Sequence, residues 1–100
     1  MQRLRIIQVD PGELRLPPNR SAGADPLKLH RQIGNFGSST EGMPPIQVTE
    51  GAHREWMIND GVTRATRICQ LSPGTTISAE VIEVRPNWDL STLPKIKETI

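Results

Sequence analysis

The sequence is poor in cysteine, in aromatic residues and in long apolar runs. Cys69 is the one cysteine among 100 residues, which excludes an intrachain disulfide framework and a cysteine-rich zinc site. The aromatic residues are Trp56, Trp88 and Phe36, with no tyrosine. No apolar run approaches the roughly 18 residues of a membrane-spanning helix, and the charged N-terminus lacks the apolar segment of a signal peptide. We therefore expect a soluble chain.

An excess of one charge is also lacking. The 12 Lys and Arg residues balance 11 Asp and Glu residues, for a formal net charge of +1. This balance excludes a polybasic arm that binds nucleic acid through bulk charge. The basic residues are nevertheless mostly arginine, whose planar guanidinium suits bidentate contacts with phosphate. The bias is compatible with anion recognition and equally with ordinary surface arginines.

The length and the turn signals predict one domain of mixed strands and helices. A chain of 100 residues is enough for a single core, and 9 prolines with 8 glycines indicate many turns. We expect strands at 3–9, 46–49, 55–59 and 75–84, and helices from Asp25-Pro26 to about 34–37 and from Asp60 or Gly61 to about Leu71. This order favours an α+β fold with a small mixed β-sheet and two main helices. The core is expected to span about 6–85, and 86–100 to form a tail with a short helical turn.

The first helix has a clear start and an amphipathic pattern. Asp25 is a favourable N-cap and Pro26 a favourable first helical residue. Leu29, Ile33 and Phe36 follow at i, i+4 and i+7, which predicts one buried stripe. Of the two tryptophans, Trp56 is the one expected in the core, because it lies in a predicted strand and Trp88 lies in the proline-flanked tail.

The second helix and the last strand also carry core patterns. Val62, Ala65 and Ile68 fall on one helix face, and Cys69 is expected to be a small core residue. The apolar residues of the last strand alternate up to Val81 and then slip by one position. This slip indicates a bulge or burial on both faces of the strand.

The strongest candidate site is the turn at residues 60–64 (DGVTR), where a strand leads into a helix. The first turn of a helix exposes unpaired N–H groups and a partial positive charge. Gly61 allows close approach of the backbone to a ligand, and Thr63 offers a hydroxyl. Arg64 and Arg67, at i and i+3, are expected to project from the helix surface. The phosphate-binding residues are therefore expected to be Gly61, Val62, Thr63, Arg64 and Arg67.

Asp60 has three alternative roles. It can cap the helix, pair with Arg64 at i+4, or hold a divalent metal ion such as Mg²⁺ beside the phosphate. The alternative to any site is an ordinary capped helix with two surface arginines.

The stretch from Pro44 to Val84 resembles the core of the ParB/sulfiredoxin-like superfamily. Members of this superfamily show a proline-containing strand lead-in, a short hairpin, and a D-G-x-x-R or G-x-x-R turn that opens a helix. Residues 45–48 (PIQV) match the lead-in, and 58–64 (INDGVTR) match the strand end and the phosphate motif. Residues 9–20 with the Asp25 helix resemble the N-terminal half, so the likeness covers most of 6–85.

The superfamily holds CTP-binding partition proteins, sulfiredoxins, a free-serine kinase and nucleases, so its fold leaves the function open. Sulfiredoxin chemistry needs a cysteine directly after the motif glycine, where this chain has Val62; Cys69 lies about two helical turns away. Partition proteins carry a glutamate and two arginines in the turn and a helix-turn-helix domain after it. The superfamily's site forms where the N-terminal loop meets the turn, which implies Arg20 as a second phosphate contact.

The phrase INDGVTRATR, followed by a proline-glycine turn, also resembles the ParB-like C-terminal modules of bacterial polymorphic toxins, including Rhs-type proteins. This resemblance implies a nuclease-type effector that acts on nucleic acid, with an immunity protein as a partner. It also implies a place in the bacterial cytoplasm or delivery into a target cell. The alternative is a nucleotide-binding (CTP or ATP) switch or kinase-like module without nuclease activity. A third interpretation is a protein-interaction module that keeps the fold and not the site.

In the nuclease hypothesis, Arg64 and Arg67 stabilise charge on the scissile phosphate. Asp60, through a divalent ion, positions the attacking water. His30 is a further candidate for catalysis, although a lone histidine is more often a structural or surface residue. Glu41 and Gly42 lie in a loop that can cover such a site.

Overall fold

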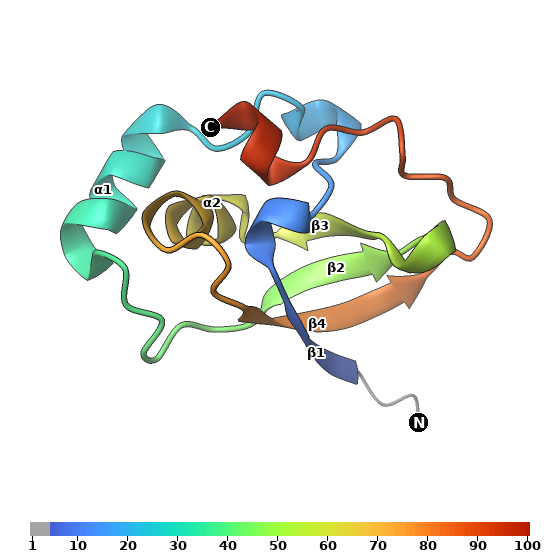
Figure 1. Ribbon diagram of the computed structural model, residues 1–100, viewed down its shortest axis with the longest axis horizontal. Helices are drawn as coiled ribbons and strands as arrows, with labels where there is room; N and C mark the ends of the chain where they lie inside the picture. Colours follow the sequence, from blue (N-terminus) through green and yellow to red (C-terminus); the bar gives the residue numbers. More distant parts are fainter. Residues whose placement is uncertain (1–4) are drawn as a thin grey trace.

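The computed structural model describes residues 5–100, and within them the chain forms a β-sheet and two main helices (Figure 1). In chain order the main elements are β1 (Arg5–Val9), α1 (Pro26–Phe36), β2 (Ile46–Glu50), β3 (Trp56–Asp60), α2 (Val62–Leu71) and β4 (Ile77–Val84). The short 3-10 helices are η1 (Pro11–Glu13), η2 (Pro18–Arg20), η3 (Ala52–Arg54) and η4 (Ile96–Thr99). These positions confirm the expected elements, except that Arg3 and Leu4 of the first strand lie outside the described residues. No helix of residues 5–100 has the length and apolarity to cross a membrane.

The four described strands form one mixed sheet in the order β1-β4-β2-β3. β1 is antiparallel to β4, β2 is parallel to β4, and β3 is antiparallel to β2. The register between β2 and β4 shifts after Val81, so that Thr49 pairs with Glu83 and Ile82 is the extra residue. The predicted bulge is therefore confirmed, as is the α+β class with a small mixed sheet and two main helices.

The core lies between the sheet and α2. Alternate residues of β2 and β4 point into it because side chains of a strand alternate between its two faces. Its strand members include Ile46, Val48, Ile77, Ala79 and Val81. The predicted face of α2 is buried, since Val62, Ala65, Ile68 and Cys69 all belong to the core.

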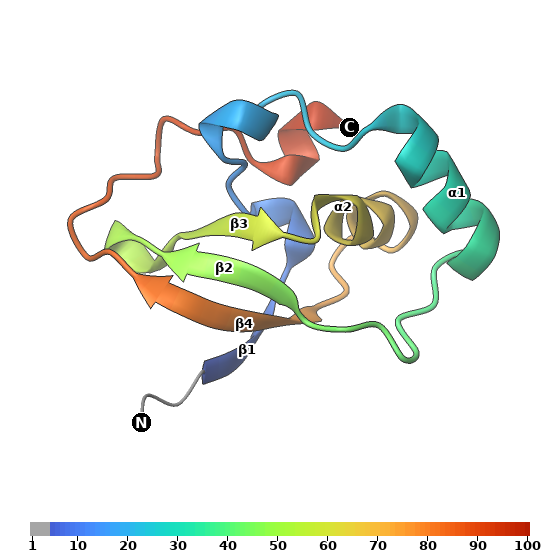
Figure 2. The ribbon, with the colours of Figure 1, turned by 180° about the vertical axis from the view of Figure 1, so that it is seen from behind.

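α1 is the outer layer of the domain. Its start is confirmed, because the Asp25 carboxylate accepts hydrogen bonds from the N–H groups of Leu27 (2.8 Å) and Lys28 (3.2 Å). The predicted buried stripe is wrong: no residue of α1 is buried, and Phe36 is 52 % exposed. Both ribbon views place α2 between α1 and the sheet, so α1 rests on one helix and is only partly covered (Figures 1 and 2). Trp56, expected in the core, is half-buried at its margin.

The C-terminal segment is part of the packed structure and not a loose tail. Ile96 is fully buried in the core. Its N–H donates to the carbonyl of Leu14 (2.9 Å), and the N–H of Arg15 donates to the carbonyl of Trp56 (2.9 Å). Segments 14–16 and 94–96 thus extend the sheet beyond the edge of β3. The sequence does not predict this contact, because it joins two short segments about 80 residues apart, neither of which shows a strand pattern.

Glu13 fastens the C-terminal segment to η1, and this contact predicts a pH dependence. Its carboxylate accepts hydrogen bonds from Lys95 (2.6 Å) and Lys97 (2.5 Å), which lower the pKa of Glu13 from 4.5 to about 2. Because folding favours the ionised carboxylate, the stabilisation is present above about pH 4.5 and is lost as the pH falls toward 2.

We expect Glu13→Gln to lower the free energy of unfolding at neutral pH by no more than about 1 kcal/mol. The reason is that the Glu13 side chain is about half exposed, so water screens its ion pairs with Lys95 and Lys97. The difference between the variant and the wild type should shrink as the pH falls from about 4.5 to about 2. Urea unfolding at a series of pH values measures it. A difference that stays constant over this range contradicts the assignment.

Candidate phosphate-binding site

The strand-to-helix junction depends on Gly61. This residue has φ 102° and ψ 23°, in the left-handed region that favours glycine. A Cβ atom at Gly61 would lie 2.6 Å from Ile46 Cγ2 and 2.9 Å from Arg64 Nη2. Glycine is thus required both for the backbone turn and for the close approach of the Arg64 guanidinium to the chain.

The beginning of α2 has no side-chain cap. Asp60 instead forms an i, i+4 ion pair with Arg64, with 3.7 Å between Oδ2 and Nη2. Of the three expected roles of Asp60, the structure shows the ion pair and not the cap. The Asp60 side chain is 69 % exposed and that of Arg64 is 25 % exposed. Among residues 5–100, no side-chain hydrogen bond caps the start of α2.

Arg64 and Arg67 line one hollow of about 260 Å³, named below the arginine hollow. The remaining lining residues come from α1 and from the loop between α1 and β2. They are Gln32, Phe36, Glu41, Gly42, Met43 and Pro44. The hollow therefore combines two guanidinium groups with one carboxylate and an apolar wall. The first residues of α2, Val62 and Thr63, do not line it.

Arg67 does not project from the surface, so that part of the prediction is wrong. It is 2 % exposed. Its Nη1 donates hydrogen bonds to the carbonyl oxygens of Gly37 (2.7 Å) and Ser39 (2.8 Å). Its guanidinium carbon lies 5.4 Å from the centroid of the Phe36 ring. The spacing of residues on α2 could not reveal this burial, because the cover comes from α1 and the following loop.

The charge of Arg67 has no counter-charge within residues 5–100, since Arg67 is in none of the ion pairs formed there. Burial lowers the pKa of the Arg67 guanidinium, but arginine stays protonated in proteins. The Nε atoms of Arg67 and Arg64 are buried and have no hydrogen-bond partner among the described residues. A buried charge without a counter-charge is costly even when carbonyl oxygens accept some of its hydrogen bonds, so an anion in the hollow would lower this cost.

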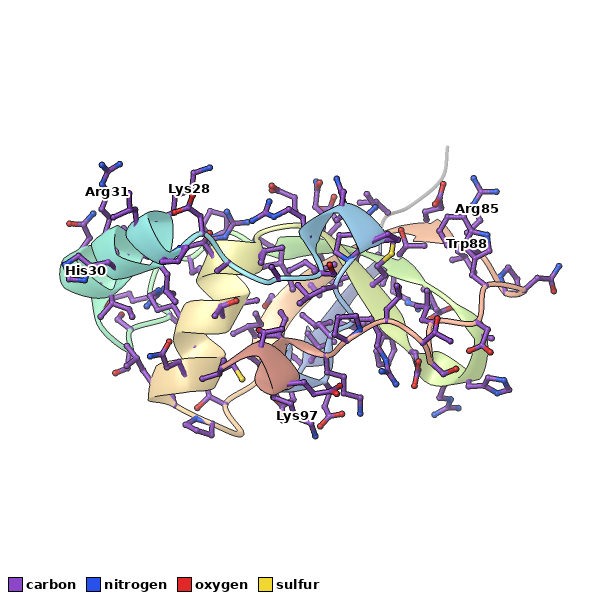
Figure 3. The ribbon with its side chains drawn as sticks, turned by 90° about the horizontal axis from the view of Figure 1, so that it is seen from above. Lys28, His30, Arg31, Arg85, Trp88 and Lys97 are labelled. Carbon is purple, nitrogen blue, oxygen red and sulfur yellow. The ribbon has the colours of Figure 1, made fainter. Side chains whose placement is uncertain are left out.

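Two expected site residues lie elsewhere. His30 is exposed on α1 and does not line the arginine hollow (Figure 3). Arg20 ends η2 and lines a second hollow together with Lys28. Arg20, which the resemblance implies as a second phosphate contact near the Gly61 turn, therefore does not line the same hollow as Arg64. Glu41 and Gly42, which the sequence places in a loop that can cover a site, do line the arginine hollow.

Sequence reasoning missed Gln32, Phe36 and Met43 as site residues. Gln32 and Phe36 are four residues apart and so share a face of α1, which is the one signal that could have paired them. Met43 follows a flexible-looking stretch and carries no such signal. All three reach the site through packing between segments that are distant in sequence.

The described residues also bear on the expectations for metal binding and for thiol chemistry. Across residues 5–100, no three His, Cys, Asp or Glu side chains gather into a metal-binding group. A divalent ion held by Asp60 alone among protein side chains remains a proposal. Cys69 is buried, as predicted, and burial raises the pKa of its thiol, which disfavours the reactive thiolate.

The role of Gly61 is testable against a matched glycine. We expect Gly61→Ala to lower the free energy of unfolding by about 2–4 kcal/mol, from backbone strain and the clash with Ile46. Gly74 also has a positive φ, 87°, but has no atom within 4 Å of its Cβ position. Gly74→Ala should therefore cost only about 1 kcal/mol. Equal losses for the two variants in urea unfolding would show that the Gly61 junction is not closely packed.

Comparison of the chain with protein-family models, with curated proteins and with solved structures finds no significant match. The resemblance to the ParB/sulfiredoxin-like superfamily therefore stays a hypothesis. The function has to be inferred from the chemistry of the arginine hollow.

Proposed function

We propose that the chain binds a phosphorylated nucleotide in the arginine hollow, with the phosphate at Arg64 and Arg67. The observation that carries the proposal is the buried guanidinium of Arg67, which lines the hollow without an ion-pair partner in residues 5–100. Guanidinium groups form strong, charge-assisted hydrogen bonds with phosphate oxygens. Such bonds are strengthened where solvent is largely excluded.

The apolar wall of the hollow suits the base of a nucleotide. Phe36 is half exposed and lines the hollow beside Met43 and Pro44. Stacking of a base on an aromatic side chain contributes about 1–3 kcal/mol. Gln32 and Glu41 add hydrogen-bonding groups that can contact the edge of the base.

The size of the hollow and the sequence motif support the same ligand. Its volume of about 260 Å³ is slightly below the usual range of small-molecule pockets, which suits a part of a single nucleotide better than a duplex. Residues 58–64 resemble the phosphate motif of the ParB/sulfiredoxin-like superfamily, which includes CTP-binding members. Of these residues only Arg64 lines the hollow, so the resemblance supports a phosphate at Arg64.

The first test of this function is Arg64→Ala. Loss of one charge-assisted contact should cost about 1.5–3 kcal/mol, or roughly ten- to a hundredfold in nucleotide affinity. The fold should persist, because the ion-pair partner of Arg64 is a largely exposed Asp60. Calorimetric titration with a panel of nucleoside mono- and triphosphates measures the effect.

Arg85→Ala is the control for nonspecific loss of positive charge. Arg85 pairs with Glu83 and lies over Trp88, at the opposite end of the molecule from α1 (Figure 3). Its removal should leave the affinity unchanged. Equal losses in the two variants, or no nucleotide binding by the wild type, would contradict the proposal.

A second candidate function is phosphodiester cleavage by a nuclease-type effector. It is favoured by two carboxylates beside the arginines: Glu41 lines the hollow, and Asp60 pairs with Arg64. Asp60 is the residue that would hold a divalent ion such as Mg²⁺, since its exposed carboxylate is a ligand of the kind Mg²⁺ prefers. Such an ion would lower the pKa of a bound water. The polymorphic-toxin resemblance adds an immunity protein as the partner of this effector.

The cleavage hypothesis is tested by incubating the protein with plasmid DNA and with RNA, with and without Mg²⁺. We expect Glu41→Gln or Asp60→Asn to reduce cleavage by about a hundredfold or more, and Asp60→Asn to leave nucleotide binding in place. Glu80→Gln, on β4, is the control for a change of surface charge. Nucleotide binding without cleavage, or cleavage that survives both substitutions, would exclude these roles.

A further inference from the structure

The exposed cations of the molecule differ in whether they form ion pairs. Within residues 5–100, the cations in ion pairs are Arg5, Arg15, Arg64, Arg85, Lys95 and Lys97. In the same part of the chain, the exposed cations that are in none of these pairs are Arg20, Lys28 and Arg31, which lie on η2 or α1, and Arg54, which lies on η3. We refer to Arg20, Lys28 and Arg31 as the cationic track.

The cationic track continues directly from the arginine hollow. Lys28, Gln32 and Phe36 are spaced i, i+4 and i+8, so they form one row along α1. Gln32 and Phe36 line the arginine hollow, while Lys28 lines the second hollow with Arg20. One helix row therefore joins the two hollows. Figure 3 shows Lys28 and Arg31 extending on the same side of α1.

Acidic groups near the track do not cancel its charge. α1 itself contains no acidic residue. Asp25 lines the second hollow. The hydrogen bonds from the N–H groups of Lys28 and Leu27 lower the pKa of its carboxyl, so it stays ionised and offsets one of the three positive charges. Arg20, Lys28 and Arg31 together still leave an excess of positive charge.

We propose that the cationic track binds the backbone of a single-stranded nucleic acid, one nucleotide of which occupies the arginine hollow. The proposal rests on the nucleotide-binding function above and names its substrate class. A base that stacks on Phe36 must be unpaired, which excludes an intact duplex. The phosphates next to that nucleotide follow α1 toward Lys28 and Arg31 and then toward Arg20. A positively charged path beside an aromatic stacking site is how proteins commonly hold single strands.

The track makes a quantitative prediction for strand length and salt. A single-stranded DNA or RNA of about ten nucleotides should bind at least tenfold more tightly than a mononucleotide, because only the longer ligand reaches the track. Removal of three phosphate contacts should reduce the slope of log affinity against log salt by about 2, at about 0.7 for each contact to a single strand.

The experiment measures fluorescence anisotropy of labelled single-stranded DNA, single-stranded RNA and duplex DNA, with unlabelled mononucleotide as a competitor. The variant carries Arg20→Gln, Lys28→Gln and Arg31→Gln together, at exposed positions without ion pairs. It should lose the advantage of the strand over the mononucleotide and keep the mononucleotide affinity of the wild type. Arg54→Gln is the control, since Arg54 is exposed on η3 and is also in none of the ion pairs of residues 5–100.

The experiment distinguishes failure of the cationic track from failure of the nucleotide-binding function. A strand that binds no more tightly than a mononucleotide, a triple variant that behaves as the wild type, or a duplex that binds as well as a single strand contradicts the track. Track-dependent strand binding without mononucleotide binding contradicts the nucleotide-binding function and leaves the track standing. A thermal melt of the triple variant verifies the fold, and the salt slope of the wild type tests the contacts without any substitution.

Discussion

The guanidinium of Arg67 donates two hydrogen bonds to the carbonyl oxygens of Gly37 and Ser39 and lies over the ring of Phe36. These contacts tie the end of α1 and the following loop to α2. They matter because α1 has no buried residue and so gains little from apolar burial. Removing a charge from water without a carboxylate partner costs free energy, which the two carbonyl oxygens offset only in part. An anion bound in the hollow would supply the counter-charge that Arg67 lacks within residues 5–100.

The same contacts form the candidate site. Holding the loop against α2 brings Glu41 and Met43 to the hollow that Arg64 and Arg67 line. Gly61 in turn allows the position of Arg64, because only a residue without a Cβ lets the Arg64 guanidinium approach the strand-to-helix junction. Two arginines on one helix thus take part both in the packing and in the candidate site, since Arg64, 25 % exposed, and Arg67, 2 % exposed, both line the hollow.

The sequence predicts what is determined locally. Asp25 and Pro26 mark the start of α1, and the slip after Val81 marks a bulge, because caps and strand alternation depend on neighbouring residues. It does not predict the burial of Arg67 or of Ile96, which depends on segments far away along the chain. The candidate site divides in the same way: Arg64 and its turn follow from the motif, whereas the wall contributed by α1 and the loop follows only from packing. Arg20 and His30 are the opposite case: the sequence suggested a role for each in the site, but neither lines the arginine hollow.

The central claim is that the guanidinium groups of Arg64 and Arg67 hold the phosphate of a nucleotide. The most direct measurement is an NMR titration that follows the arginine Nε–H groups of ¹⁵N-labelled protein as a nucleoside monophosphate is added. The account predicts saturable shifts of the Arg64 and Arg67 signals, because their Nε atoms have no partner among the described residues, and an unchanged Arg85 signal. Unchanged Arg64 and Arg67 signals at saturating nucleotide, or shifts confined to other arginines, would contradict it.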